Sequence, residues 1–210
     1  NIKIPNGLIG LLCCYKNISE YQFLLNYLRD KKPDIILNLL VQRQLIEIKE
    51  EEEIAKDIKS LTKIDDNISI KVMGQYESNP YPRWLNLTEG SSYKNYLEYI
   101  KKTLPEKNLF SEEFEIKNVL IAGCGTGKHP LEVAKIDPTL KITAIDISKP
   151  SIAYGIRKSR EFGIKNITWA QADILKLNEI DKKFDLVESS GVIHHLKDPN
   201  KGFLMLNKKL

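Results

Sequence analysis

The segment NVLIAGCGTGKHPLEVA, residues 118–134, constrains the fold more than any other part of the chain. Its apolar run predicts a buried β-strand, and its second half has the spacing of an amphipathic helix. Between the two, Gly123, Gly125 and Gly127 permit a tight turn that a bound molecule can approach closely. The segment therefore predicts a strand, a ligand-binding loop and a helix in direct succession.

Strands and helices continue to alternate through residue 210. The runs KITAIDI, NITWAQ and FDLVESS predict three more strands, and a last helix is expected at DPNKGFLMLNKKL. In the helix that follows KITAIDI, Ser148 is the expected N-cap, Pro150 lies in the first turn and Gly163 ends the helix. Elements that alternate in this way form right-handed crossovers and a parallel sheet. We therefore predict an α/β fold for residues 116–210.

The first part of the chain lacks this alternation. Residues 1–75 are predicted to form a helical N-terminal region, in which Ser19 caps one helix and Pro33 lies in the first turn of another. Residues 76–115 are predicted to form a connector between this region and the α/β part. The chain is thus expected to have three successive segments.

The connector contains the segment YESNPYPRW, in which two prolines favour extended conformations. One interpretation is a strap packed over a core, with Trp84 buried and Arg83 paired. The other is a strap that also covers a ligand site and brings Tyr81 to it. Both interpretations stay open at the level of the sequence.

The composition argues against several function classes. The 32 basic and 28 acidic residues are scattered, so nothing indicates a nucleic-acid partner. No apolar run approaches the length of a membrane span, and the first residues do not resemble a signal peptide, so we expect a cytoplasmic protein without a membrane partner. Its three cysteines and three histidines lack the spacing of a zinc site, so no bound metal is expected.

The glycine-rich loop was compared with three kinds of ligand-binding turn. A phosphate-binding loop would need a glycine at Ala122 and a hydroxyl at His129. A dinucleotide-binding loop would need a third glycine at Lys128. The pattern here suits S-adenosylmethionine, a ligand without phosphate that needs a flat turn free of side chains.

Two carboxylates follow strands in positions that suit an adenosine. Asp146 ends the second strand, 19 residues after Gly127, and can accept hydrogen bonds from both ribose hydroxyls. Asp173 follows the third strand and can accept from the adenine amino group, while Ile174 offers a backbone N–H to the ring. A turn cap is the alternative role for Asp173.

Four motifs in order, VLIAGCGTG, ITAIDIS, QADIL and FDLVESSGVIHHLKDP, resemble the class I S-adenosylmethionine-dependent methyltransferases. The resemblance implies a Rossmann-like sheet with strand order 3-2-1-4, preceded by the helical region, and S-adenosylmethionine as the cofactor. The cofactor-binding residues that it implies are Ala122, Gly123, Gly125, Gly127, Asp146, Ile147, Asp173, Ile174, Ser189, Tyr81 and Arg83.

A narrower resemblance covers nearly the whole chain. The segments YESNPYPRW and LIAGCGTGKHPLEVA, with the helical segments before them, are similar to the methyltransferase region of bacterial proteins that carry tetratricopeptide repeats. A protein partner is therefore expected, either for the helical region or for a repeat region outside this sequence. The family fold has seven strands and only four are predicted here, so we expect a truncated domain that is inactive by itself. The family's acid before the first glycine is replaced by Ile121.

The resemblance implies methyl transfer to an acceptor that is a protein or a small molecule. His194, His195 and Glu188 are the candidates for a base if the acceptor must lose a proton. Tyr81 and Trp84 are candidates for a cation–π contact with the sulfonium. Two alternatives stay open: a non-catalytic module that binds a nucleoside or a protein, and an NAD(P)-dependent oxidoreductase.

Overall fold

The computed structural model describes residues 4–29, 35–78, 80–88, 93–104 and 114–210. The chain divides into two compact units, Asn1–Glu53 and Ile54–Leu210, and the division falls within helix α4 (Glu47–Asp57). Each unit has its own hydrophobic core and is described by itself. The segment boundaries expected at residues 75 and 115 stay predictions.

The first unit is helical. It contains α1 (Asn6–Cys13), η1 (Ile18–Glu20), α2 (Gln22–Arg29), α3 (Ile35–Val41), the π-helical turn η2 (Gln42–Ile46) and the start of α4. Gln44 connects two of its turns, because its side chain donates to the Cys13 carbonyl at 3.1 Å and accepts from the Ile18 N–H at 3.2 Å.

One predicted cap in this unit is wrong. Ser19 lies inside η1, and Asn17 stands at the N-cap, where its backbone N–H donates to Glu20 Oε1 at 3.1 Å. A glutamate three residues after the cap can reach back to the backbone of the cap. Since η1 starts at Ile18 and α2 starts at Gln22, Ser19 does not precede the first residue of either helix. The second predicted helix-start residue, Pro33, lies outside the described residues.

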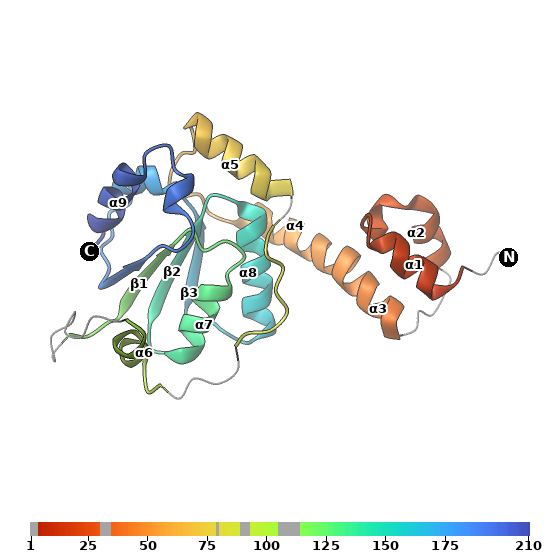
Figure 1. The fold of residues 1–210 in the computed structure, drawn as a ribbon, viewed down its shortest axis with the longest axis horizontal. Coiled ribbons are helices and arrows are strands. Elements are labelled where there is room, and N and C mark those ends of the chain that lie inside the picture. Colours follow the sequence, from red (N-terminus) through yellow and green to blue (C-terminus); the bar gives the residue numbers. More distant parts are fainter. Residues whose placement is uncertain (1–3, 30–34, 79, 89–92, 105–113) are drawn as a thin grey trace. The chain divides into compact units, whose positions relative to one another are not determined.

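The second unit is built on a four-stranded parallel sheet (Figure 1). The strands are β1 (Asn118–Ala122), β2 (Lys141–Asp146), β3 (Ile167–Gln171) and β4 (Leu186–Glu188). Their order is β3-β2-β1-β4, and all three pairings are parallel. The predicted α/β fold and strand order are therefore confirmed.

Helices cover both faces of the sheet. On one face, Val119 and Ile121 pack in a core with residues of α6 (Tyr96–Thr103), α7 (Lys128–Ile136) and α8 (Lys149–Glu161). On the other face, Leu120 and Ala122 pack against the 3₁₀ segment η3 (Ile174–Glu179) and α9 (Pro199–Asn207). A central parallel strand that is buried on both faces reads as the continuous apolar run seen in the sequence.

The helix α8 begins and ends as predicted. The Ser148 side chain accepts from the Ser151 N–H at 3.2 Å, and Pro150 lies in the first turn. Gly163, just past the helix, has a φ of +69°. Within the described ranges, no helix is long and apolar enough to cross a membrane.

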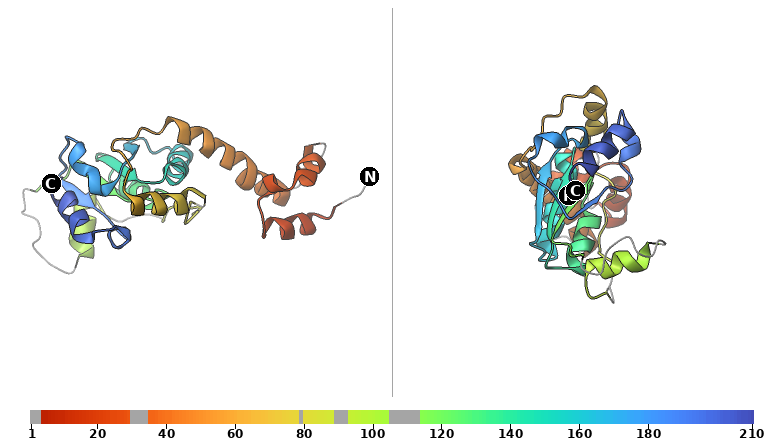
Figure 2. Two further views of the ribbon diagram at one scale, coloured as in Figure 1. Left: turned by 90° about the horizontal axis from the view of Figure 1, so that it is seen from above. Right: turned by 90° about the vertical axis from the view of Figure 1, so that its left-hand side faces the viewer.

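Two helices, α5 (Asn67–Ser78) and α6, precede the sheet. They lie at opposite ends of it: α5 beside the ends where the strands finish, and α6 near the ends where they begin (Figures 1 and 2). The sequence did not predict α6, which falls in the expected connector. A short 3₁₀ turn, η4 (Ile193–His195), follows β4.

Residues 80–88 are called the strap from here on, and they pack on the rest of the second unit. Trp84 is 8% exposed, and its ring N–H donates to the Thr126 carbonyl at 3.1 Å. Thr126 in turn donates its hydroxyl to the Pro82 carbonyl at 2.7 Å, and the Tyr154 hydroxyl donates to the carbonyl of Trp84. The strap is therefore hydrogen-bonded both to the glycine-rich loop and to α8.

Candidate cofactor site

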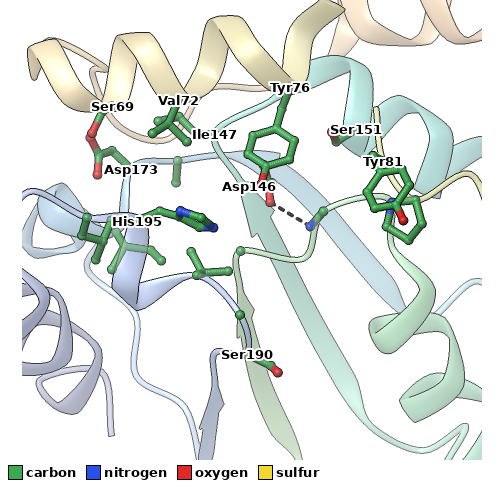
Figure 3. Close-up of a pocket in the computed structure, with 18 residues that line it drawn as sticks. Ser69, Val72, Tyr76, Tyr81, Asp146, Ile147, Ser151, Asp173, Ser190 and His195 are labelled. Atoms are coloured by element: carbon green, nitrogen blue, oxygen red, sulfur yellow. Dashed lines mark hydrogen bonds between the residues drawn. The ribbon is translucent and has the colours of Figure 1, made fainter. Parts of the chain in front are cut away.

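A cavity of ≈ 340 Å³ lies where the strands of the sheet finish (Figure 3). This is the edge at which open α/β sheets bind their ligands. Its walls come from α5, the strap and the loops that follow all four strands. They are formed by Ser69, Val72, Tyr76, Tyr81, Pro82, Gly123, Gly125, Asp146, Ile147, Ser151, Ala172, Asp173, Ile174, Ser190, Gly191, Val192, His195 and Leu196.

The structure brings many, but not all, of the predicted site residues to this cavity. Those in its walls are Tyr81, Gly123, Gly125, Asp146, Ile147, Asp173, Ile174 and His195. Those outside its walls are Ala122, Gly127, Ser189, Arg83, His194 and Glu188. Ala122, the last residue of β1, is buried in the core, and the Arg83 guanidinium lies 4.6 Å from the centre of the Tyr154 ring.

The contribution of α5 to the cavity was not predicted from the sequence. Ser69, Val72 and Tyr76 recur at helical spacing and line one wall of the cavity (Figure 3). That spacing was the available signal, since it places the three side chains on one face of a helix. Nothing in the local sequence shows where this helix packs.

The three loop glycines all have left-handed backbone conformations but different surroundings. Gly125, with a φ of +52°, has open space where a Cβ would lie, which suits the close approach of a ligand. A Cβ on Gly123 would clash with Val192. At Gly127 it would lie 2.9 Å from Gly155 Cα and 2.7 Å from the Trp169 ring. Gly127 thus allows the start of α7 to pack closely on α8 and β3.

Asp146 holds the loop in place. Its Oδ2 accepts from the Gly125 N–H at 2.7 Å, and its Oδ1 accepts from the Ser148 N–H at 2.9 Å. The family has an acid at the position of Ile121. In this chain Asp146, on the neighbouring strand, supplies the carboxylate that holds the loop. Burial raises the pKa of Asp146, against the effect of these hydrogen bonds. Each carboxylate oxygen still has a lone pair for a further donor.

Among the described residues, one carboxylate oxygen of Asp173 has a hydrogen-bond donor and the other has none. Asp173 is 2% exposed, and its Oδ1 accepts from the Leu175 N–H at 2.8 Å, so the turn-cap role is present. Its Oδ2 is buried and has no hydrogen-bond partner among the described residues. A buried carboxylate oxygen without a donor is costly. The atom therefore fits an N–H donor on a bound ligand, such as an adenine amino group.

The three candidates for a base lie in different places. The rings of His194 and His195 are 4.0 Å apart, but only His195 lines the cavity. Glu188 is turned toward α6 and α7, where it contacts Tyr96 and His129. Glu188 therefore lies beside the cavity wall and does not line the cavity.

With this geometry in view, the chain was compared with known proteins. Residues 114–208 match a protein family described as a methyltransferase domain. The matched part contains the whole sheet and most of the cavity walls. The match supports the predicted methyltransferase domain in this part of the chain, and S-adenosylmethionine is the cofactor expected of that class. The narrower grouping with tetratricopeptide-repeat proteins stays a prediction.

Three similar proteins illustrate the range of the match. An uncharacterized protein of Synechococcus sp. is 36% identical over 93 residues, which are 44% of this chain and 22% of that protein. Malonyl-[acyl-carrier protein] O-methyltransferase of Bacillus cereus is 30% identical over 112 residues, 51% of this chain and 40% of that protein. PKMT2 from Rickettsia typhi, solved in complex with AdoHcy, is 29% identical, with a TM-score of 0.47 and coverage of 60% and 25%. The chain thus spans less than half the length of these proteins.

Proposed function

We propose that this chain is the cofactor-binding part of an S-adenosylmethionine-dependent methyltransferase. The observation that carries the proposal is the unpaired Oδ2 of Asp173, which lies in the same cavity as the glycine-rich loop and Asp146. A buried acceptor at this place needs a donor, and the adenine amino group supplies one.

The cavity suggests how the cofactor lies. Asp173 and Ile174, after β3, suit the adenine, and Asp146, at the end of β2, suits the ribose hydroxyls. The methionine part would then lie over Gly125, where the space above the backbone is open. This direction follows the strand order from β3 toward β1 and β4.

The residues of the chain act mainly by binding and orientation. S-adenosylmethionine, when bound, supplies an activated methyl group. The carboxylates fix the adenosine, and the glycine-rich loop allows the sulfonium to come close to the backbone. Tyr81, which the strap carries to the cavity wall, offers an aromatic face for a cation–π contact. Orientation of this kind accounts for a large share of the rate in a displacement between two bound molecules.

A thermal-shift measurement on the full-length protein tests the proposal. S-adenosylhomocysteine at about 100 times its Kd should stabilise the protein by about 2.7 kcal/mol and raise its Tm accordingly. Asp146→Asn should abolish this rise. Asp185→Asn is the matched control, because Asp185 accepts from the Asn118 N–H at 2.7 Å at the other end of the sheet, outside the cavity walls.

The outcomes separate the proposal from its alternative. The control variant should lower the Tm but keep the rise caused by the ligand. If wild-type protein shows no rise, the proposal is wrong. If it shows the rise but transfers no labelled methyl group to protein, lipid or small-molecule pools, a non-catalytic binding module is favoured.

A further inference from the structure

Three polar side chains meet beside the end of β4. The Tyr96 hydroxyl donates to Glu188 Oε1 at 2.8 Å, and Glu188 Oε2 lies 2.9 Å from His129 Nε2. Tyr96 is 2% exposed, whereas the side chains of Glu188 and His129 are 21% and 46% exposed. The cluster therefore runs from the core to the surface, with the histidine ring at its outer end.

The hydrogen bonds in this cluster fix where the protons lie. Burial, together with the negative charge of Glu188, raises the pKa of Tyr96, so its hydroxyl stays protonated and donates. The Glu188 carboxylate can only accept, so a neutral His129 must carry its proton on Nε2. Its Nδ1 then has a lone pair. An imidazole that a carboxylate holds in one tautomer is suited to act as a general base.

The strand pairing places this cluster close to the cavity wall. Glu188 pairs with Ile121 on β1, two residues before Gly123. Ser190, two residues after Glu188, also lines the cavity. Glu188 and His129 therefore lie beside the loops that follow β1 and β4.

The proposed position of the cofactor then decides which end of it faces the cluster. Asp173 and Asp146, the two carboxylates proposed to bind the adenosine, lie at the ends of β3 and β2. In the order β3-β2-β1-β4, these two strands lie on the other side of β1 from β4. The methionine part and its methyl group consequently lie toward β1 and β4. His195 is in the wall, but Figure 3 shows its ring on the same side as Asp173, away from Tyr81. His195 therefore belongs to the part of the wall where the adenosine is proposed to lie.

We infer that His129 accepts a proton from the methyl acceptor, and that Glu188 and Tyr96 are positioning residues for its ring. The inference rests on the proposed function. The acceptor nitrogen or oxygen forms a bond to the methyl carbon, while the C–S bond breaks and leaves its electron pair on sulfur. The acceptor's proton passes to His129 Nδ1 and then to water, which the half-exposed ring can reach. The acceptor class is therefore one with an N–H or O–H group at the attacking atom.

Histidine-selective NMR of the full-length protein tests the placement without an acceptor. The His129 ring signal, assigned by its loss in His129→Gln, should shift when S-adenosylhomocysteine saturates the protein. Glu188→Ala, which removes the acceptor, should change the tautomer signature of His129 while the affinity for S-adenosylhomocysteine stays unchanged. The control is Lys141→Gln, an exposed position at the start of β2, which should alter neither.

The NMR outcomes distinguish this inference from the proposed function. A His129 signal that does not move, in a protein that binds S-adenosylhomocysteine, would overturn the inference alone. Absence of binding would overturn the proposed function as well. A His129 tautomer that is the same in Glu188→Ala as in wild type would show that the carboxylate does not position the ring.

Transfer of a labelled methyl group from S-adenosylmethionine tests the chemical role. With the acceptor fraction that wild type labels, His129→Gln should lower the rate by about 10²- to 10⁴-fold without changing the affinity for S-adenosylhomocysteine. A rate equal to that of wild type would contradict a base at His129. So would a labelled acceptor whose attacking atom has no proton to lose, such as a thioether.

Discussion

At the scale of single residues, Gly125 and Gly127 share a conformation but face different surroundings. Gly127→Ala puts a methyl group 2.9 Å from the backbone of Gly155, which cannot move away without shifting α8. We expect it to lower the free energy of unfolding by about 2–4 kcal/mol. Gly125→Ala meets nothing within 4 Å and should cost only about 1 kcal/mol through its backbone conformation.

Ligand binding should reverse this ranking. Gly125 lines the cavity, so a methyl group there should weaken S-adenosylhomocysteine binding by about tenfold or more, a loss of about 1.4 kcal/mol. Urea unfolding gives the stabilities, and calorimetric titration gives the affinities. Equal losses of stability in the two variants would contradict the packing role of Gly127.

Asp146 should make cofactor binding depend on pH. Its folded-state pKa is raised above 3.8 by burial, so its own contribution to stability is fully present below 3.8 and is lost as the pH rises through the folded pKa. The pH dependence of ligand binding has the opposite sign, because the ribose hydroxyls donate hydrogen bonds to the charged carboxylate. The affinity for S-adenosylhomocysteine should therefore fall as the pH is lowered through the raised pKa.

Calorimetric titration at a series of pH values measures this effect. Asp146→Asn should bind weakly at every pH and should lack the acid-side decline. If wild type keeps the same affinity down to pH values near 4, Asp146 does not contact the ligand in its charged form.

At the scale of elements, the strap should stabilise the glycine-rich loop that it contacts. Trp84→Phe removes the donor to the Thr126 carbonyl and leaves that buried acceptor unpaired, which should cost about 1–3 kcal/mol. Leu85→Ala, at an exposed position of the same strap, should change stability by less than about 0.5 kcal/mol. Chemical denaturation compares the two variants, and equal stabilities would show that the strap does not support the loop.

Elements with a local signal could be predicted from the sequence. Each strand of the sheet contains apolar residues in succession, and α8 is flanked by its cap Ser148 and its stop Gly163, so their positions followed from short segments. The glycine pattern and the two aspartates likewise predicted the part of the cavity wall that the loops after β1, β2 and β3 form.

Elements that depend on distant contacts could not be predicted in this way. The face that α5 presents to the cavity is set by packing on the finished fold. The hydrogen bond from Tyr96 to Glu188 joins residues 92 positions apart, and no local pattern indicates it. Segment 59–62 runs beside β3, where the Leu61 N–H donates to the Gln171 carbonyl at 2.8 Å, and its own residues do not read as a strand.

At the scale of the whole molecule, the two compact units differ in what they contribute. All residues of the cavity walls belong to the second unit, Ile54–Leu210. The first unit has a separate core built around Ile9, Ile18 and Leu24. A protein partner for the helical region stays a prediction, as does the cytoplasmic location.

A crystal structure of the full-length protein with S-adenosylhomocysteine tests the central claim most directly. It should show the ribose hydroxyls on the Asp146 carboxylate and the adenine amino group on Asp173 Oδ2, at hydrogen-bond distances of about 2.7–3.2 Å. The sulfur should lie toward the loops after β1 and β4. A ligand bound elsewhere on the chain, or one whose adenine leaves Asp173 Oδ2 unpaired, would contradict it.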